Sequence, residues 1–348
     1  MRFHLVGLPH TQLTTTYSVC AYTQKALKFA EMMQARGHEV ILYWSEDSDS
    51  SSEVVSCISK AEQMQLGFHG PEDYLKADFD HTKPLFSLFN ANVIEALNER
   101  IEPKDYLLLS MGASHQPVID AFPKHLRVEY GIGYSGISMS TFRVFESVAW
   151  RHFVSGIYEL DGQFYDEVIP NYFDISQFPT PPSEPDDYFL YIGRLTTRKG
   201  YQIAVDACQS TQSRLKIAGV GDIPSYGEYQ GMVGPEQRGE LMANAVGVFT
   251  PTLYIGPFEG VSVEANICGT PVITTDWGSY SENVIEGFNG FRCKSMRDFR
   301  RAMDLCVDVD RQAIREWAIE RFSTESVGAQ YEEYFERLAT LWGPGFYG

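Results

Sequence analysis

Residues Thr250–Cys293 read TPTLYIGPFEGVSVEANICGTPVITTDWGSYSENVIEGFNGFRC and predict a strand, a glycine-bearing loop, a helix and a second buried strand. The loop leads into the helix that carries Glu264 in its first turns. The start of a helix has unpaired backbone N–H groups and the positive end of the helix dipole, so a glycine loop before it favours a diphosphate. The stretch therefore predicts a phosphate site in which Glu264 binds a ribose.

The alternation of strands and helices extends over the rest of the chain. RFHLVGL near the N-terminus, residues 20–36 and HEVILYW predict a strand, a helix and a strand, which together form one βαβ unit. The residues PTPPSEPDD at 179–187 interrupt both periodicities, as a linker does. The alternation restarts at YFLYIG and ends in a long amphipathic helix at 324–342, which we expect to pack on a neighbouring domain.

The predicted fold class is α/β, with two Rossmann-like domains. A chain of 348 residues is long enough to form two cores. Ligands of open α/β sheets bind beyond the carboxyl ends of the strands, so we expect the loops of the two domains to face each other across a cleft. The predicted boundaries are 1–177 for the N-terminal domain, 178–187 for the linker, 188–323 for the C-terminal domain and 324–348 for the last helix.

Composition argues against several classes of partner. The chain has 46 Asp and Glu against 28 Lys and Arg, a net charge of −18, and no segregated basic patch, which disfavours nucleic acid. No run approaches the roughly 20 apolar residues of a membrane span, and the N-terminus lacks a signal-peptide pattern. The six cysteines and eight histidines form no metal-binding array. We therefore expect a cytoplasmic protein with reduced cysteines and no metal site.

A second phosphate-binding element is predicted at YIGRLTTRKG, residues 191–200. Arg194 and Lys199 follow a hydrophobic strand, where a guanidinium and an ammonium group can clamp a diphosphate. The alternative is a surface Arg and Lys at a helix start. A cation near a helix N-terminus opposes the dipole unless an anion lies between them, which favours the phosphate interpretation.

Several segments, in order, carry a more specific resemblance. VIPNYFD (168–174), YIGRLTTRKG, LKIAGVGD (215–222), PFEGVSVEANICGTPVITTD (257–276) with Glu282 and FNGF, and ERFSTESVGAQYEEYF (320–335) resemble the signatures of the family 4 retaining glycosyltransferases, which have the GT-B fold. The resemblance covers the second half of the chain and the last helix. The first half matches in architecture and in RGHEV after the first helix.

The resemblance implies an activity and a set of site residues. It implies transfer of a hexosyl group from a nucleoside diphosphate sugar to an acceptor with retention, without a metal or other cofactor, and a last helix that crosses back to the first domain. Arg194 and Lys199 then neutralise the diphosphate, Glu264 binds the ribose hydroxyls, and backbone groups near Met232 and Val233 contact the base. The implied donor-binding residues are Gly193, Arg194, Lys199, Met232, Val233, Gly256, Phe258, Glu259, Gly260, Val261 and Glu264.

The chain departs from the family pattern in its second half. The first glutamate of the family's Glu-x7-Glu motif falls eight residues before Glu264, where this chain has Gly256, while Glu259 stands where the family has glycine. One hypothesis is that Glu259 supplies the missing carboxylate and that Gly256 keeps a close backbone approach. The alternative is that Glu259 caps the helix.

The first half departs as well. The loop PHTQLTTTYS (9–18) lacks the family's paired glycines, and EYGIGYSG (129–136) lacks its histidine. Tyr134 and His115 are the candidates to contact the sugar or the acceptor, with packing as the alternative for Tyr134 and a surface position at a helix start for His115. Two other functions stay open: a nucleotide-sugar epimerase or phosphorylase on the same fold, and a binding protein that has lost transfer.

Overall fold

The computed structural model describes residues 1–17 and 20–342 and contains two compact units. Unit 1 comprises Met1–Phe145, Ile157–Ile169 and Gly328–Gly348, and unit 2 comprises Glu146–Gly156 and Pro170–Val327. The predicted 178–187 linker lies within unit 2. Residues 343–348 of the predicted C-terminal segment and Ser18 of the predicted threonine-rich loop lie outside the described residues.

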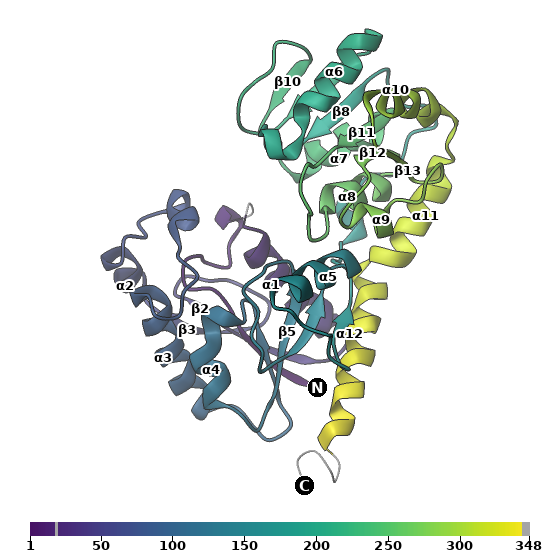
Figure 1. The fold of residues 1–348 in the computed structure, drawn as a ribbon. Helices are drawn as coiled ribbons and strands as arrows, with labels where there is room; N and C mark the ends of the chain where they lie inside the picture. Colours follow the sequence, from purple (N-terminus) through teal and green to yellow (C-terminus); the bar gives the residue numbers. More distant parts are fainter. Residues whose placement is uncertain (18–19, 343–348) are drawn as a thin grey trace. The chain divides into compact units, whose positions relative to one another are not determined.

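Each unit is built on one parallel sheet (Figure 1). The seven strands of unit 1 lie in the order β3-β2-β1-β4-β5-β6-β7, and the six strands of unit 2 in the order β10-β9-β8-β11-β12-β13. The strands are β1 (Arg2–Val6), β2 (Glu39–Ser45), β3 (Glu53–Ile58), β4 (Tyr106–Leu109), β5 (Leu126–Ile132), β6 (Phe142–Phe145), β7 (Glu167–Val168), β8 (Phe189–Ile192), β9 (Leu215–Ala218), β10 (Glu228–Gly231), β11 (Gly247–Thr250), β12 (Val272–Thr275) and β13 (Gly290–Cys293).

In each sheet, the direction in which the chain adds successive strands changes once. In unit 1 the chain moves from β1 outward to β3 and returns with β4 on the other side of β1; in unit 2 it moves from β8 to β10 and returns with β11 beside β8. At such a reversal the loops after the two central strands separate to opposite faces, which opens a crevice at the carboxyl edge of the sheet. Each unit therefore has one favoured ligand position, between β1 and β4 and between β8 and β11.

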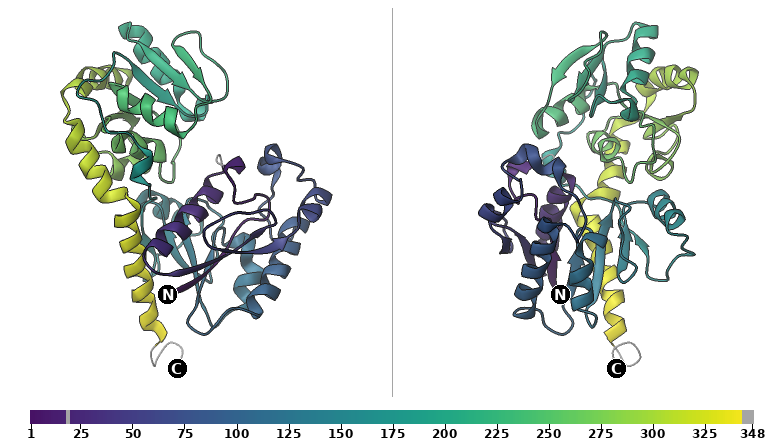
Figure 2. Two further views of the ribbon diagram at one scale, coloured as in Figure 1. Left: turned by 180° about the vertical axis from the view of Figure 1, so that it is seen from behind. Right: turned by 60° about the vertical axis from the view of Figure 1, so that its left-hand side comes forward.

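Helices cover both faces of each sheet (Figure 2). In unit 2, buried side chains of α6 and α10 pack on one face and those of α7 and α8 on the other. The helices are α1 (Ala21–Ala35), α2 (Lys60–Gln65), α3 (Pro84–Asn98), α4 (Gln116–Ala121), α5 (Val148–Ile157), α6 (Tyr201–Thr211), α7 (Pro235–Asn244), α8 (Gly260–Ile267), α9 (Tyr280–Asn283), α10 (Met296–Leu305), α11 (Arg311–Phe322) and α12 (Thr324–Ala339).

From Gly328 on, α12 belongs to unit 1. Its Phe335 is fully buried, with its ring centroid 4.7 Å from that of Phe3 and 5.2 Å from that of Tyr106. The Tyr106 hydroxyl donates to the Phe335 carbonyl at 2.7 Å. The apolar face of this helix therefore completes the core of unit 1.

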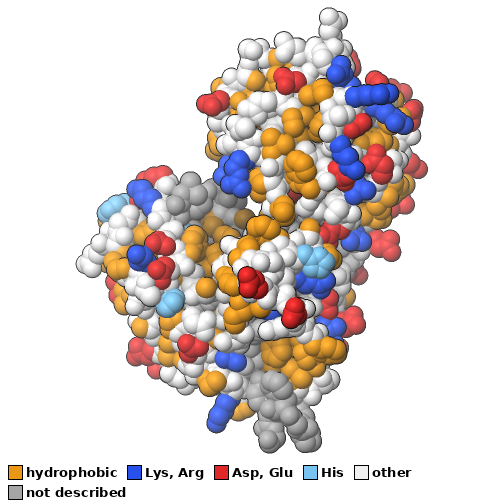
Figure 3. Space-filling view, viewed as in Figure 1, with side chains coloured by type: hydrophobic (Ala, Val, Ile, Leu, Met, Phe, Trp, Pro, Cys, Tyr) orange, Lys and Arg blue, Asp and Glu red, His pale blue; other side chains and the backbone are white. Residues whose placement is uncertain are grey.

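The surface carries both signs of charge. On the face shown in Figure 3, acidic and basic side chains are interspersed, and a group of Lys and Arg side chains lies at α10, whose sequence is MRDFRRAMDL. None of the helices within residues 1–17 and 20–342 is both long and apolar enough to span a bilayer.

Replacing Phe335 by alanine should lower the free energy of unfolding by about 3–5 kcal/mol, because it removes a fully buried ring and leaves a cavity. Phe164 is 93% exposed, so Phe164→Ala is the matched control and should change this free energy by about 0.5 kcal/mol or less. Urea unfolding followed by circular dichroism measures both. Equal losses in the two variants would contradict the packing of α12 on unit 1.

Candidate functional site

The two predicted phosphate elements meet at the reversal point of unit 2. β8 and β11 pair directly, and the loop after each strand begins at its carboxyl end. Gly200 has φ 69°, and a Cβ there would lie 2.1 Å from the carbonyl oxygen of Pro251, so glycine is required for the close approach of the two loops. The Tyr191 hydroxyl donates to the carbonyls of Arg194 at 2.9 Å and Lys199 at 3.4 Å, which fixes the first loop.

An ion pair joins the two loops. Lys199 Nζ lies 3.0 Å from Glu259 Oε2, and Thr252 Oγ1 donates to the same oxygen at 3.1 Å. The exposed fractions of the two charged side chains are 23% and 7%, so the pair is largely removed from water. Burial lowers the pKa of Lys199, but the attraction of Glu259 and hydrogen bonds with Tyr254 and Glu259 outweigh burial and raise this pKa. Lys199 is therefore a permanent cation at neutral pH.

Glu259 occupies an unusual position before α8. Its φ of 60° and ψ of 57° lie in the left-handed region, which non-glycine residues rarely adopt. Glu259 is the N-cap residue of α8, as the alternative predicts, but within the described structure its side chain makes no capping hydrogen bond. A Cβ on Gly256 would lie 1.9 Å from Glu259 Oε1. The Glu259 carboxylate therefore fills the space that a side chain at position 256 would take.

Glu264 lies on α8 and is paired with a residue of α7. Its Oε1 is 3.1 Å from Arg238 Nη2, and its side chain is 12% exposed. Met232 and Val233, predicted to lie near the base, follow β10 directly and precede α7; the Met232 side chain is 75% exposed. The ribose and base candidates thus lie on consecutive elements of unit 2.

The remaining donor-site candidates divide into exposed and structural positions. Arg194 is exposed, and Gly260 and Val261 form the start of α8. Phe258 is 2% exposed, with its ring centroid 6.4 Å from that of Phe173, so it anchors the loop in the core. Gly193 directly follows β8.

Two further residues of these loops, Arg198 and Tyr254, were not predicted from the sequence. The Arg198 guanidinium lies 4.4 Å from the centroid of the Tyr254 ring, and Lys199 Nζ lies 5.0 Å from it. The aromatic ring therefore holds two adjacent cations together. The Arg198-Lys199 dipeptide in TTRKG and an aromatic residue shortly after a strand were the available signals.

The structure places His115 and Tyr134 in the interior of unit 1. His115 is fully buried, its Nδ1 lies 2.8 Å from Asn90 Oδ1, and burial lowers its pKa to about 3. The surface alternative for His115 is therefore wrong. Tyr134 is 7% exposed, and its hydroxyl donates to Glu129 Oε2 at 2.8 Å and accepts from the backbone N–H of Gly112 at 3.3 Å. Burial and the neighbouring Glu129 raise the pKa of Tyr134.

A second histidine lies at the reversal point of unit 1. His10 is in the loop that follows β1, is 3% exposed and packs edge-on against Phe79 with ring centroids 5.1 Å apart. Burial lowers its pKa to about 4, and its Nδ1 has no hydrogen-bond partner among the described residues. Its place shortly after a predicted strand end was the signal that sequence reasoning passed over.

Comparisons with known proteins bear on the fold and on unit 2. Residues 186–308 match the family model described as glycosyl transferases group 1. An uncharacterised glycosyltransferase of Methanocaldococcus jannaschii is 31% identical over 124 residues, which cover 31% of this chain and 32% of the relative. The match thus spans about a third of the relative's length. The similarity to glycosyltransferases thus concerns residues 186–308, which lie in unit 2.

Solved structures show that the chain has the GT-B fold. Sucrose-phosphate synthase from Thermosynechococcus elongatus aligns with a TM-score of 0.71 and 15% identity over 98% of this chain and 99% of its own. The Anabaena protein HepE, in complex with UDP-glucose, aligns with a TM-score of 0.66 and 17% identity over 98% and 100%. At these identities the likeness concerns the fold.

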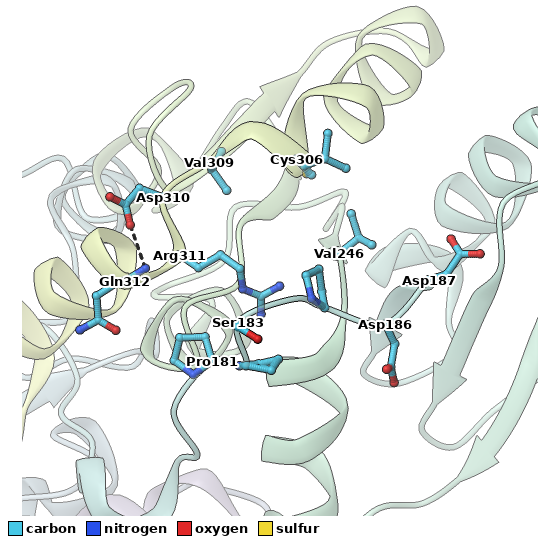
Figure 4. A pocket seen from close by; sticks show the side chains of 13 residues that line it. Pro181, Ser183, Asp186, Asp187, Val246, Cys306, Val309, Asp310, Arg311 and Gln312 are labelled. Atoms are coloured by element: carbon cyan, nitrogen blue, oxygen red, sulfur yellow. Dashed lines mark hydrogen bonds between the residues drawn. The ribbon is translucent and has the colours of Figure 1, made fainter.

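Unit 2 also contains a cavity of about 720 Å³ (Figure 4). Pro181, Ser183 and Asp186 of the predicted linker line one side of it, and Arg311 lies among them. The Arg311 guanidinium donates to the Ala245 carbonyl at 2.8 Å. None of the predicted site residues that the structure describes lines this cavity, so it is separate from the loops at β8 and β11.

The described residues contain no group of three His, Cys, Asp or Glu side chains placed to hold a metal ion. The independence of the reaction from metal stays a prediction.

The buried His115 should make stability depend on pH. The pKa of His115 in the folded protein, about 3, lies below its ordinary value of 6.5. Between these pH values His115 is protonated in the unfolded chain and neutral in the folded protein. The free energy of unfolding should therefore be fully retained above pH 6.5 and decrease as the pH falls below it. His115→Gln should show a shallower decrease between pH 7 and 5 than the wild type in urea unfolding. His152, which is exposed, supplies the control His152→Gln; identical slopes in all three proteins would contradict this assignment.

Proposed function

We propose that the chain is a retaining hexosyltransferase that moves a hexosyl group from a nucleoside diphosphate sugar to an acceptor without a metal ion. The observation that carries this proposal is the presence of two ion pairs in unit 2: Lys199 with Glu259, between the loops that follow β8 and β11, and Arg238 with Glu264, between α7 and α8. A nucleotide sugar has an anionic diphosphate between a ribose and a hexose, both rich in hydroxyl groups. Cations stabilise the diphosphate, and carboxylates accept hydrogen bonds from the hydroxyl groups of the ribose and the hexose.

The diphosphate is the leaving group and gains negative charge as the bond to the anomeric carbon breaks. Arg194, Lys199 and the backbone N–H groups at the start of α8 are the donors that would meet this charge. Arg194 is exposed, whereas Lys199 is half-buried and held by Glu259, so Arg194 can close on the ligand while Lys199 is already in place. Preorganised donors of this kind stabilise the transition state without a metal.

Glu259 is proposed to accept a hydrogen bond from a hydroxyl of the hexose. Its carboxylate fills the space of a side chain at position 256, which supports the hypothesis that the exchange of Gly256 and Glu259 conserves a carboxylate. In the retaining route that the family resemblance implies, the acceptor attacks the anomeric carbon on the same face of the sugar from which the diphosphate leaves. A diphosphate oxygen then takes the acceptor's proton, and no separate carboxylate pair is required.

The acceptor is proposed to bind unit 1, at the loops that follow β1, β4 and β5. These loops hold His10, His115 and Tyr134, and the carboxyl edge of a parallel sheet is the favoured ligand position. Because the polar atoms of Tyr134 are engaged inside the protein, we assign it to shaping this edge. All six cysteines are free and buried, which supports a reducing compartment such as the cytoplasm.

A panel of UDP-, ADP- and GDP-linked hexoses, screened by thermal shift, tests the donor assignment. The true donor should raise the melting temperature, since a ligand that binds only the folded state stabilises it. Proton NMR of the reaction with that donor then reports the product, which should keep the anomeric configuration of the donor. A changed sugar without transfer would identify an epimerase, and stabilisation without hydrolysis or transfer would identify a binding protein.

Arg194→Ala and Lys199→Ala should each lower kcat/KM by about 100-fold or more, since each removes a donor to the developing diphosphate charge. Arg214 forms an exposed pair with Glu228 elsewhere on unit 2, so Arg214→Ala is the matched control and should keep normal rates. Steady-state kinetics with the identified donor measures all three. Near-normal rates for the first two variants would contradict the site assignment.

The exchange of glycine and glutamate can be reversed by design. Glu259→Gly should lower kcat about tenfold or more, because it removes the carboxylate proposed to bind the hexose. Adding Gly256→Glu should recover part of this loss, since the new side chain enters the space that Glu259 has left. If Glu259→Gln and Glu259→Gly both kept full turnover and donor affinity, Glu259 would have no part in transfer.

A further inference from the structure

Arg238 connects two parts of unit 2 that the proposed function assigns to one nucleoside. It lies on α7, which follows Met232 and Val233, the residues predicted to contact the base, and its Nη2 lies 3.1 Å from Glu264 Oε1 on α8. The Cys268 thiol donates to the Gly239 carbonyl at 3.7 Å, so the two helices are also joined next to this pair. A shift of α7 would therefore move Glu264 and the base segment together.

The ion pair has the exposure expected of groups at the rim of a site. The Glu264 side chain is 12% exposed and that of Arg238 is 36% exposed. A largely buried carboxylate on a flexible side chain needs a fixed partner to hold one orientation, and a guanidinium supplies directional donors for this. The contact with Arg238 is made by Oε1 of the Glu264 carboxylate.

Charge gives Arg238 a second role. A nucleoside diphosphate brings at least two negative charges to the loops at β8 and β11, and an unpaired carboxylate beside them would repel the ligand. Lys199 already compensates Glu259 in this way. Arg238 compensates Glu264, so that both carboxylates can accept from hydroxyl groups while the site stays favourable to an anion.

We propose that Arg238 is a positioning residue of the donor site, which holds Glu264 in the orientation that accepts a hydrogen bond from the ribose hydroxyls. This inference rests on the proposed function, in which Glu264 binds the ribose. Its consequence is selectivity: the site should distinguish a ribonucleoside diphosphate from its 2′-deoxy counterpart, and this distinction should depend on Arg238. A pair that only joins α7 to α8 would affect stability and leave the selectivity unchanged.

Isothermal titration calorimetry with UDP, ADP and GDP identifies the tightest ligand, and its 2′-deoxy form is then titrated. The wild type should bind the ribonucleotide at least about tenfold more tightly, because the deoxy form leaves a buried acceptor unpaired. Arg238→Leu should raise the Kd of the ribonucleotide about tenfold and bring the ratio of the two Kd values toward one. Arg238→Lys should restore most of the ratio, and Arg214→Leu, which removes an exposed Arg–Glu pair, should leave it unchanged.

A double-mutant cycle tests whether Arg238 acts through Glu264. Arg238→Leu combined with Glu264→Gln should bind the ribonucleotide no more weakly than Glu264→Gln alone. Additive losses, or an Arg238→Leu variant that keeps the wild-type ratio, would overturn the inference and leave the proposed function standing. If the wild type bound none of the three nucleoside diphosphates, both the proposed role of Arg238 and the proposed function would be contradicted. Thermal melts of each variant show that the folded protein is being compared.

Discussion

The ion pair between Lys199 and Glu259 is the interaction on which the rest of the site depends. It connects the loop after β8 to the residue before α8, and these are the two elements that the sequence marks for phosphate binding. Removing one partner of a largely buried pair leaves an uncompensated charge and costs about 3–5 kcal/mol. Glu259 also has a left-handed backbone conformation, which a non-glycine residue adopts only when its surroundings require it.

The proposed donor site gathers cations in an otherwise acidic protein. The chain carries a net charge of −18, which disfavours anions in general, while Arg194, Arg198 and Lys199 gather within one loop. Tyr254 holds two of these cations against one ring, and the carboxylates of the site are each paired with a basic side chain. The local field is therefore set by the loops, whatever the charge of the remaining surface.

The central strands were predictable from sequence because they are buried on both faces. YLLL and FLYI read as continuous apolar runs, and they form β4 and β8. The edge strand β10 has the sequence EYQG and is partly exposed, so no hydrophobic pattern marks it. The amphipathic helices α10 and α11 were passed over for a related reason: their sequences are rich in arginine and acidic residues.

The residues of the proposed donor site could be predicted from the sequence, but the contacts between them could not. Glycine loops, cations and Glu264 are visible in the sequence, but the pairing of Lys199 with Glu259 depends on a positive φ that no sequence pattern requires of glutamate. The Arg238–Glu264 pair depends on how α7 packs beside α8. His115 looked like a surface residue in SMGASHQP and is buried, since Phe86 and Phe89 of α3 pack against its ring.

The most direct measurement is hydrogen–deuterium exchange of the wild type with and without the nucleoside diphosphate that binds it most tightly. A ligand that contacts backbone groups slows their exchange, so the account predicts protection in residues 193–200, 231–234 and 251–264. Residues 181–187 and 306–312, which line the separate cavity, should exchange at an unchanged rate. Protection confined to that cavity, or to unit 1, would contradict a donor site built on the Lys199–Glu259 pair.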